Sequence, residues 1–286
     1  MTDKQNDLKQ WWDKLSDFWK DILLVHSEME KEKITYQDVK EIGWHTCFSS
    51  YETLSQKKFE RLSKQAVNME EILAISYLWL YAPYQIFDEE EKKQIDALYP
   101  LSNLKHLCLN DTNVENISVL ENFKKLEEVD LSTTEMEDLK PLESLSLLKE
   151  INLLWSQIKD ISSLTSLTQL KSLNLGHIPL KDFTPLQGLI NLQKLELFGT
   201  SFSNTKLLTG MKKLKYLRLD CTKTTDLEPL SSLGDLEYLD ICATKIKSIQ
   251  PLFSLKLKAL VCADTKIKKD ELSQFRKLNP KCVIEN

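Results

Sequence analysis

The chain has 286 residues, 42% hydrophobic and 28% charged, which is the composition of an ordered, soluble protein with room for a sizeable core. Its 6 glycines argue against glycine-rich phosphate loops, and no apolar run reaches the roughly 18 residues that a membrane helix needs. Residues 1–100 hold 13 basic and 19 acidic residues, and residues 101–286 hold 25 and 24. Neither region has the basic excess typical of nucleic-acid-binding proteins.

The chain begins with apolar residues at helical spacing, which predict a helix from about Asp3 to Glu30. Three tryptophans lie on it: Trp11, Trp12 and Trp19. They either pack inside an N-terminal cap or onto the first repeat, or they form a helix that binds a partner. Aromatic residues at helical spacing are more often core, which favours packing.

Further helices are predicted in the rest of this region. One begins near Thr35, a second spans about residues 50–66, and a short charged helix covers residues 88–97. Between the last two, residues 68–81 form either a fourth helix or, at residues 76–80, an irregular first strand that pairs with a strand at Leu107. The strand is the favoured alternative.

A repeat of 22 residues begins after Pro100 and governs the remaining chain. It has the form L-x-x-L-x-L, with a second apolar column later in each unit. The first leucine of each unit stands at Leu104, Leu126, Leu148, Leu170, Leu192, Leu214, Leu236 and Leu257. The alternation predicts one short strand per unit, and one unit cannot bury its apolar face alone, so the units must stack.

This pattern resembles the leucine-rich repeat family, in its short internalin-like class of bacterial type. The resemblance implies an α/β solenoid: a curved array with one parallel strand per repeat, an N-terminal helical cap and a C-terminal cap of helix and strand. We therefore expect three parts, namely a helical cap region over residues 1–100, eight repeats over residues 101–267 and a C-terminal cap over residues 268–286.

One repeat departs from the pattern. After each strand the family usually places an asparagine that bonds to the loop backbone. Here threonine or serine takes that position and can still form hydrogen bonds, except at Ile178. The loop around Ile178 is therefore expected to be irregular, or else the isoleucine is one tolerated substitution. At the C-terminus, residues 270–278 predict an amphipathic helix that Asn279 and Pro280 end, followed by a last strand at Val283 and Ile284.

No catalytic signature is present in the sequence. The metalloprotease, nucleophile-elbow, phosphate-loop and paired-cysteine motifs are absent, and the six cysteines form no compact framework. We expect a non-enzymatic cytoplasmic protein with reduced thiols, with no cofactor, no bound metal, and neither a nucleic acid nor a membrane as its partner.

The register of the leucines identifies the side chains that point out of the concave strand face. Three adjacent repeats place large groups there, and tyrosines and charged residues continue the surface. The predicted partner-binding residues are Trp155, His177, Phe198, Leu154, Tyr216, Arg218, Tyr238, Asp130 and Glu196. This face carries eight acids and two bases, which favours a basic protein partner. The function predicted is a protein-protein interaction module. The alternative is a regulatory subunit or effector that docks onto an enzyme through the repeats and the helical cap.

Overall fold

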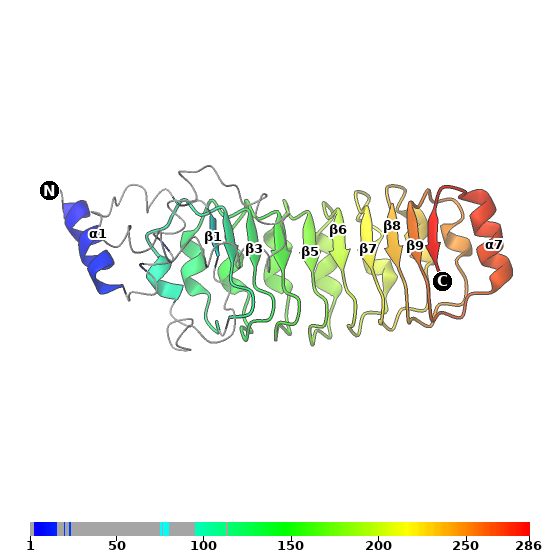
Figure 1. Cartoon of the computed structure of the whole chain (residues 1–286), viewed down its shortest axis with the longest axis horizontal. Helices are drawn as coiled ribbons and strands as arrows, with labels where there is room; N and C mark the ends of the chain where they lie inside the picture. Colours follow the sequence, from blue (N-terminus) through cyan, green and yellow to red (C-terminus); the bar gives the residue numbers. More distant parts are fainter. Residues whose placement is uncertain are drawn as a thin grey trace, which may run out of the picture.

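A parallel sheet of ten strands forms one side of the molecule and follows the order of the sequence from β1 to β10 (Figure 1). We describe it from a computed structural model, in which residues 3–15, 20, 23, 75, 77–79, 95–112 and 114–286 are described. The strands are β1 Tyr77–Trp79, β2 His106–Cys108, β3 Glu128–Asp130, β4 Glu150–Asn152, β5 Ser172–Asn174, β6 Lys194–Glu196, β7 Tyr216–Arg218, β8 Tyr238–Asp240, β9 Ala259–Val261 and β10 Val283–Glu285. The chain is a curved solenoid with one strand per repeat, as the sequence predicts.

Short 3-10 helices return the chain behind the sheet in each coil. They are η1 Ile95–Leu98, η2 Ser118–Asn122, η3 Lys140–Leu142, η4 Ser162–Ser166, η5 Thr184–Gly188, η6 Thr205–Leu208, η7 Glu228–Ser232 and η8 Gln250–Leu252. The core lies between the two layers and contains the repeat leucines, most of which are fully buried. Strand centres pair in register, for example Val129 with Ile151 and Leu173 with Leu195, so each core column continues from coil to coil.

The turn that follows each strand has the same backbone in every repeat. Its key residue adopts a positive φ of 52–67° at Asp111, Thr133, Trp155, His177, Gly199, Cys221, Ala243 and Asp264. The left-handed conformation costs a non-glycine residue roughly 1–2 kcal/mol. In the first seven of these turns the same residue donates its N–H to a carbonyl of the following coil at 2.7–3.1 Å, which extends the sheet ladder past the strand and offsets this cost.

The residue after the positive-φ residue closes the turn with its side-chain hydroxyl. In one such turn the Thr200 hydroxyl donates to the carbonyl of Leu197 at 2.6 Å. The other members of this column are Thr112, Thr134, Ser156, Thr222, Thr244 and Thr265, each bonded to the carbonyl three residues earlier. The expected irregular loop at Ile178 does not occur. His177 has the same φ of 54°, and Ile178 is buried, so apolar burial there replaces the hydroxyl bond.

The N-terminal side contains a confirmed strand and a helix over the first part of the expected range. β1 pairs with β2, so the strand alternative is correct. Helix α1 spans Asp3–Lys14, and Leu15 lies in a bend where its N–H donates to the carbonyl of Trp12 at 3.1 Å. Lys20 and Leu23 are again helical, and the rest of the expected helix up to Glu30 lies outside the described residues. Trp11 is buried and packs edge-on against Tyr99, which agrees with a packing role.

Several other predictions for this region fall outside the described residues: Trp19, the helix near Thr35, the helix at 50–66 and most of the helix at 88–97. Of the last, residues 95–97 lie in η1. The proposed boundary at residue 100 stays a prediction, although β1 lies before it and belongs to the same sheet as the repeats.

The C-terminal end closes as the sequence predicts. Helix α7, Lys269–Leu278, buries Leu272 and Phe275 and ends at Asn279, and β10 then pairs with β9. Glu271 fastens the helix to the last coil, because its Oε1 accepts hydrogen bonds from the backbone N–H groups of Ile249 and Gln250 at 2.6 and 2.8 Å. Helix α7 thus covers the C-terminal end of the core (Figure 1).

Candidate functional site

Three aromatic rings form a continuous stack beyond the ends of β4, β5 and β6. The Trp155 and His177 rings lie parallel, with centroids 3.9 Å apart and planes tilted by 8°. His177 in turn meets Phe198 edge-on at 5.2 Å. Trp155 is the most exposed member, with 55% of its surface open to solvent, while His177 and Phe198 are half-buried. We call these three residues the aromatic strip.

Two glycines leave room for the rings of His177 and Phe198. A Cβ at Gly199 would lie 2.3 Å from the His177 ring, and its φ of +67° further favours glycine. A Cβ at Gly176 would lie 2.5 Å from the Phe198 ring and 2.9 Å from Leu154 Cδ1. Phe198 and Leu154 therefore both reach over Gly176, which places Leu154 beside the strip.

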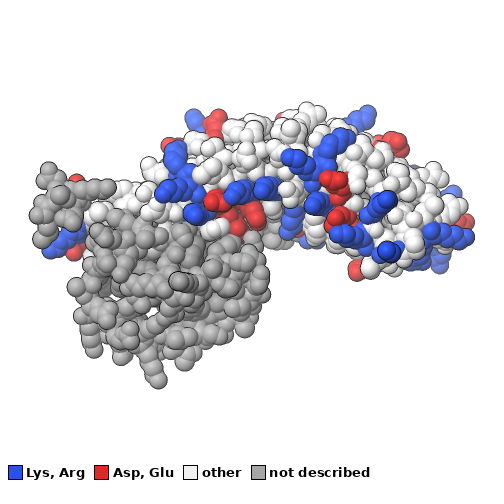
Figure 2. All heavy atoms as spheres, turned by 90° about the horizontal axis from the view of Figure 1, so that it is seen from above, with Lys and Arg blue, Asp and Glu red and all other residues white. Residues whose placement is uncertain are grey.

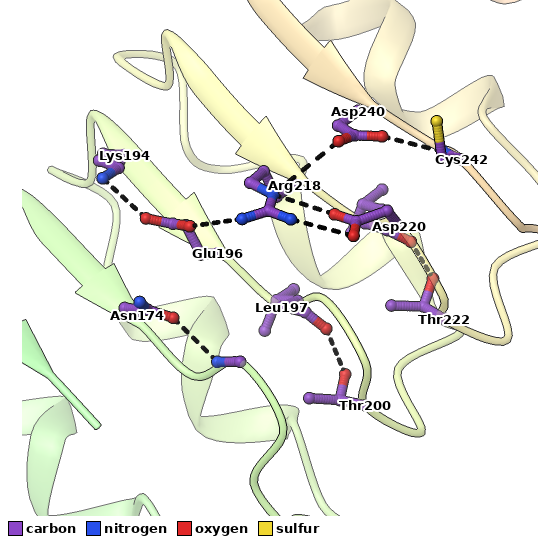
Figure 3. A network of polar contacts seen from close by, with 12 residues as sticks. Asn174, Lys194, Glu196, Leu197, Thr200, Arg218, Asp220, Thr222, Asp240 and Cys242 are labelled. Atoms are coloured by element: carbon purple, nitrogen blue, oxygen red, sulfur yellow. Dashed lines mark hydrogen bonds and ion pairs between the residues drawn. The ribbon is translucent and has the colours of Figure 1, made fainter. Parts of the chain in front are cut away.

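Arg218 closes the strip on its C-terminal side. Figure 3 shows its guanidinium among the carboxylates of Glu196, Asp220 and Asp240. Its guanidinium lies 3.9 Å from the centroid of Phe198, within the range of a cation–π contact. The same group binds Asp220 through two hydrogen bonds of 3.0 Å and approaches Glu196 at 3.4 Å. Asp240 lies at 3.9 Å. One arginine therefore serves three carboxylates and one ring.

A second aromatic pair lies at the strand starts. Tyr216 and Tyr238 stack with centroids 4.3 Å apart, and the Lys194 ammonium lies 5.2 Å from the Tyr216 ring. Burial raises the pKa of Tyr216, with Tyr238 and Glu196 adding to the shift, so the phenol stays neutral at physiological pH. Arg218 follows Tyr216 by two residues on the same strand face and lies between the two aromatic groups.

Asp130 serves the fold of its own turn. Its Oδ1 accepts the Ser132 N–H at 2.9 Å and its Oδ2 accepts the Asn152 amide at 3.0 Å. Asn152, Asn174 and Asp240 accept a backbone N–H two residues onward in the same way. This is the geometry in which Asx residues shape turns. Several acids predicted as charged rim therefore have structural partners, and Glu196 is itself buried beside Lys194 and Arg218.

The ionisation of Asp130 opposes folding. Burial raises its pKa, against the lowering effect of its hydrogen bonds, so the folded chain holds this proton more tightly than the unfolded chain. The carboxyl therefore makes stability fall as pH rises from about 4 through the raised pKa. We expect Asp130→Asn to gain stability relative to the wild type between pH 3.5 and pH 7, measured by urea unfolding across that range.

The matched control for this prediction is Asp182→Asn. The Thr184 backbone and hydroxyl lower the pKa of Asp182, so its ionised form contributes stability that is lost as pH falls. The two variants should therefore diverge from the wild type in opposite directions. Parallel pH profiles for the two variants would show that burial does not oppose the ionisation of Asp130.

The structure thus brings most of the predicted site residues into contact, in two groups joined by Arg218. Leu154, Trp155, His177 and Phe198 form one group, and Tyr216, Tyr238 and Glu196 meet around Lys194 and Arg218. The hydrogen bonds of Asp130 lead to Ser132 and Asn152 and not to the strip.

Four participants were missing from the predicted set: Lys194, Asp220, Gly176 and Gly199. Spacing alone could have identified Asp220, which follows Arg218 by two residues. The close approach of the rings to the glycines depends on packing.

Several charged side chains of the array are paired across neighbouring coils. Lys149 bonds Glu127, and Lys258 bonds Glu237 at 2.7 Å. On the face seen in Figure 2, basic and acidic side chains accordingly lie next to one another in short rows. Over residues 3–15, 20, 23, 75, 77–79, 95–112 and 114–286, no group of three or more His, Cys, Asp or Glu could hold a metal ion. In that same part of the chain no helix has the length and apolar character needed to cross a membrane.

Comparison with known proteins finds a family model that matches part of the repeat array. A family model described as "Leucine Rich repeats (2 copies)" matches residues 102–144. No curated protein sequence matches the chain significantly.

Solved structures with the same fold extend the likeness over two thirds of the chain. An internalin (inlF) from Listeria monocytogenes is similar with a TM-score of 0.60 and 25% identity, covering 68% of this chain and 66% of its own. Internalin C2 of the same organism gives 0.59 and 25%, with 71% and 86% covered. A plant peptide hormone receptor (RGFR1), in complex with RGF2, gives 0.54 and 19%, with 67% and 33% covered, and shares the fold alone. The 22-residue frame, the matching repeat model and the two internalin structures together show that this chain has the solenoid fold of leucine-rich repeat proteins and resembles the internalins.

Proposed function

We propose that this chain is a non-enzymatic protein-binding module that holds a partner protein on the concave face of its sheet. One observation carries the proposal: Trp155 is 55% exposed on the sheet side, at the end of a stack built from the chain's own residues. A large exposed aromatic ring is unfavourable in water unless a partner covers it, and tryptophan is enriched at binding hot spots.

The site is preorganised for binding. His177 holds one face of the indole, Phe198 holds His177, and the ladder hydrogen bond from Trp155 N–H to Gly176 O at 3.0 Å fixes the backbone below. A side chain that is already ordered loses little conformational entropy when a partner binds. Rigid-surface recognition of this kind suits a solenoid, in which each coil is braced by its neighbours.

The charge of the face supports a basic partner. In coils β2 to β5 the outward positions of the strands and turns hold Asp111, Glu128 and Glu150, besides Asp130 in its hydrogen-bonded turn, and no lysine or arginine. In coils β6 to β8, by contrast, Lys194 and Arg218 are paired with acids. A surface of one sign attracts a partner of the other and speeds its encounter.

Similar proteins support a protein-binding role, and the free thiols support a cytoplasmic location without enzymatic activity. Leucine-rich repeat proteins mediate protein-protein interactions, and the plant receptor with this fold is in complex with RGF2. The described cysteines Cys108, Cys221, Cys242, Cys262 and Cys282 are free thiols, which supports the cytoplasmic location that we include in the proposal. Burial, with Asp240 nearby, raises the pKa of Cys242 to about 12, so this thiol is not a ready nucleophile.

Trp155→Thr tests the proposal with a residue that the chain itself uses, because Thr133 occupies the same slot one coil earlier. We expect unfolding in urea to stay within about 1 kcal/mol of the wild type, since the indole is mostly exposed. Binding of a partner captured with the wild-type chain should weaken by about 2 kcal/mol, or roughly thirtyfold, which calorimetric titration would measure.

The control is Leu147→Ser, which removes an equally prominent apolar side chain, 47% exposed, from a turn outside the sheet face. Its affinity for the partner should equal that of the wild type. Equal affinity in Trp155→Thr as well would contradict the proposal and shift attention to the helical N-terminal region.

A further inference from the structure

The aromatic strip is closed at one end and open at the other. At its C-terminal end the Arg218 guanidinium lies 3.9 Å from the Phe198 ring. At its N-terminal end Trp155 has one ring contact among the described residues, the His177 ring on one face of the indole. The opposite face of the indole is therefore turned along the sheet toward the preceding coil, where no ring or cation of the described residues stacks on it.

The residue beside that open face has a small side chain, and the equivalent residue one coil further toward the N-terminus is an acid. Thr133 occupies the equivalent position in the preceding coil and is exposed, so it fills little of the space that an aromatic ring would fill. Asp111 occupies the same position one coil before Thr133. It is also exposed and has the same turn conformation. Two coils correspond to about 10 Å along a sheet. A planar group stacked about 4 Å from Trp155 would lie roughly 6 Å from the row of Asp111.

We propose that a basic protein partner places an arginine side chain in this gap, with its guanidinium stacked on Trp155 above Thr133 and paired with Asp111. The inference rests on the proposed function and specifies the chemistry of the contact. It would complete the strip symmetrically: Arg218 of this chain covers one end, and an arginine of the partner covers the other.

Arginine fits this position better than lysine. A guanidinium is planar, stacks on aromatic faces and carries donors in its plane that can reach a carboxylate beside the ring. Arg218 shows this double use within the chain, since it stacks on Phe198 while its Nε and Nη2 bind Asp220 at 3.0 Å. An ammonium would satisfy the charge of Asp111 but would not cover the indole.

The inference can be tested without the natural partner. The probes are tri-arginine amide and tri-citrulline amide, which differ in replacing each guanidinium by a neutral urea of nearly the same shape. The readout is the ¹H–¹⁵N signal of the Trp155 indole in the full-length chain, assigned by its loss in Trp155→Thr. We expect tri-arginine amide to shift this signal saturably. Tri-citrulline amide should bind at least threefold more weakly.

Asp111→Asn and Asp264→Asn form a matched pair of variants. Both replace an exposed aspartate in the same turn conformation, with φ of 56° and 55°, at opposite ends of the array, and asparagine tolerates that conformation. Asp111→Asn should weaken tri-arginine binding at least threefold and reduce its dependence on salt, whereas Asp264→Asn should leave both unchanged.

The outcomes separate this inference from the proposed function. Equal shifts with both peptides, or equal losses in both aspartate variants, would overturn the arginine contact. The arginine contact would also be overturned if tri-arginine amide left the Trp155 signal unmoved. In each of these cases a captured partner that still loses affinity with Trp155→Thr would leave the proposed function standing.

Discussion

Leu173→Ala is expected to lower the free energy of unfolding by about 2–5 kcal/mol, as large-to-small changes in a packed core do. Leu173 is fully buried and lies in the middle of the array, where its strand pairs with Ile151 on one side and Leu195 on the other. Each coil is supported only by its neighbours, so a cavity in the fifth strand weakens two interfaces at once. Urea unfolding followed by circular dichroism would measure the loss.

Ser172→Ala provides the control on the same strand, because Ser172 is the preceding residue and points out of the opposite face. Its stability should stay within about 0.5 kcal/mol of the wild type. A Leu173→Ala chain as stable as Ser172→Ala would mean that the strand register is wrong, and with it the assignment of every outward side chain.

Arg218→Met is expected to cost about 2 kcal/mol, between the value of an exposed ion pair and that of a fully buried one. Methionine keeps an apolar stem beside Phe198 but leaves Glu196, Asp220 and Asp240 facing one another (Figure 3). Among the described residues, Lys194 alone would still form an ion pair with this group, through its 2.7 Å contact with Glu196. Thermal and urea unfolding of the two chains would give the difference.

A second substitution shows whether charge causes this loss. Asp220→Asn in the Arg218→Met background removes the carboxylate that has lost its two bonds, and the slot accepts neutral residues elsewhere, as at Ser132 and Cys242. We expect the double variant to be more stable than Arg218→Met alone, with a coupling energy of about 1 kcal/mol or more from the complete cycle. Additive losses would indicate that Arg218 acts through packing alone.

The repeat frame made the array predictable. Three apolar positions that recur every 22 residues, and after 21 in the last repeat, determine the strand centres, the core columns and the outward slots. β2 to β9 therefore follow from the sequence without any knowledge of the turns. β1 was less certain, because residues 76–80 lack the repeat signature and could have continued a helix. β10 was predictable from its apolar residues directly after the helix stop at Asn279 and Pro280.

The contacts of individual side chains could not be predicted from the repeat pattern. The sequence places Trp155, His177 and Phe198 in adjacent slots, but their stacking depends on Gly176 and Gly199, whose missing Cβ atoms make room for the rings. Asp130 looked like a free rim charge because its hydrogen bonds with Ser132 and Asn152 form only when the coils stack. The turn at Ile178 was expected to be irregular because isoleucine cannot form the hydroxyl hydrogen bond of the other turns. Its burial in the core replaces that bond.

We expect a partner to lie on the sheet face at Trp155. Photocrosslinking from that position tests it most directly. The chain would carry p-benzoylphenylalanine at position 155 or, in a separate preparation, at position 147, and each would be irradiated with the captured partner. We predict a covalent product from position 155 that competing wild-type chain suppresses, and none from position 147. Crosslinking from position 147 but not from position 155 would contradict the claim.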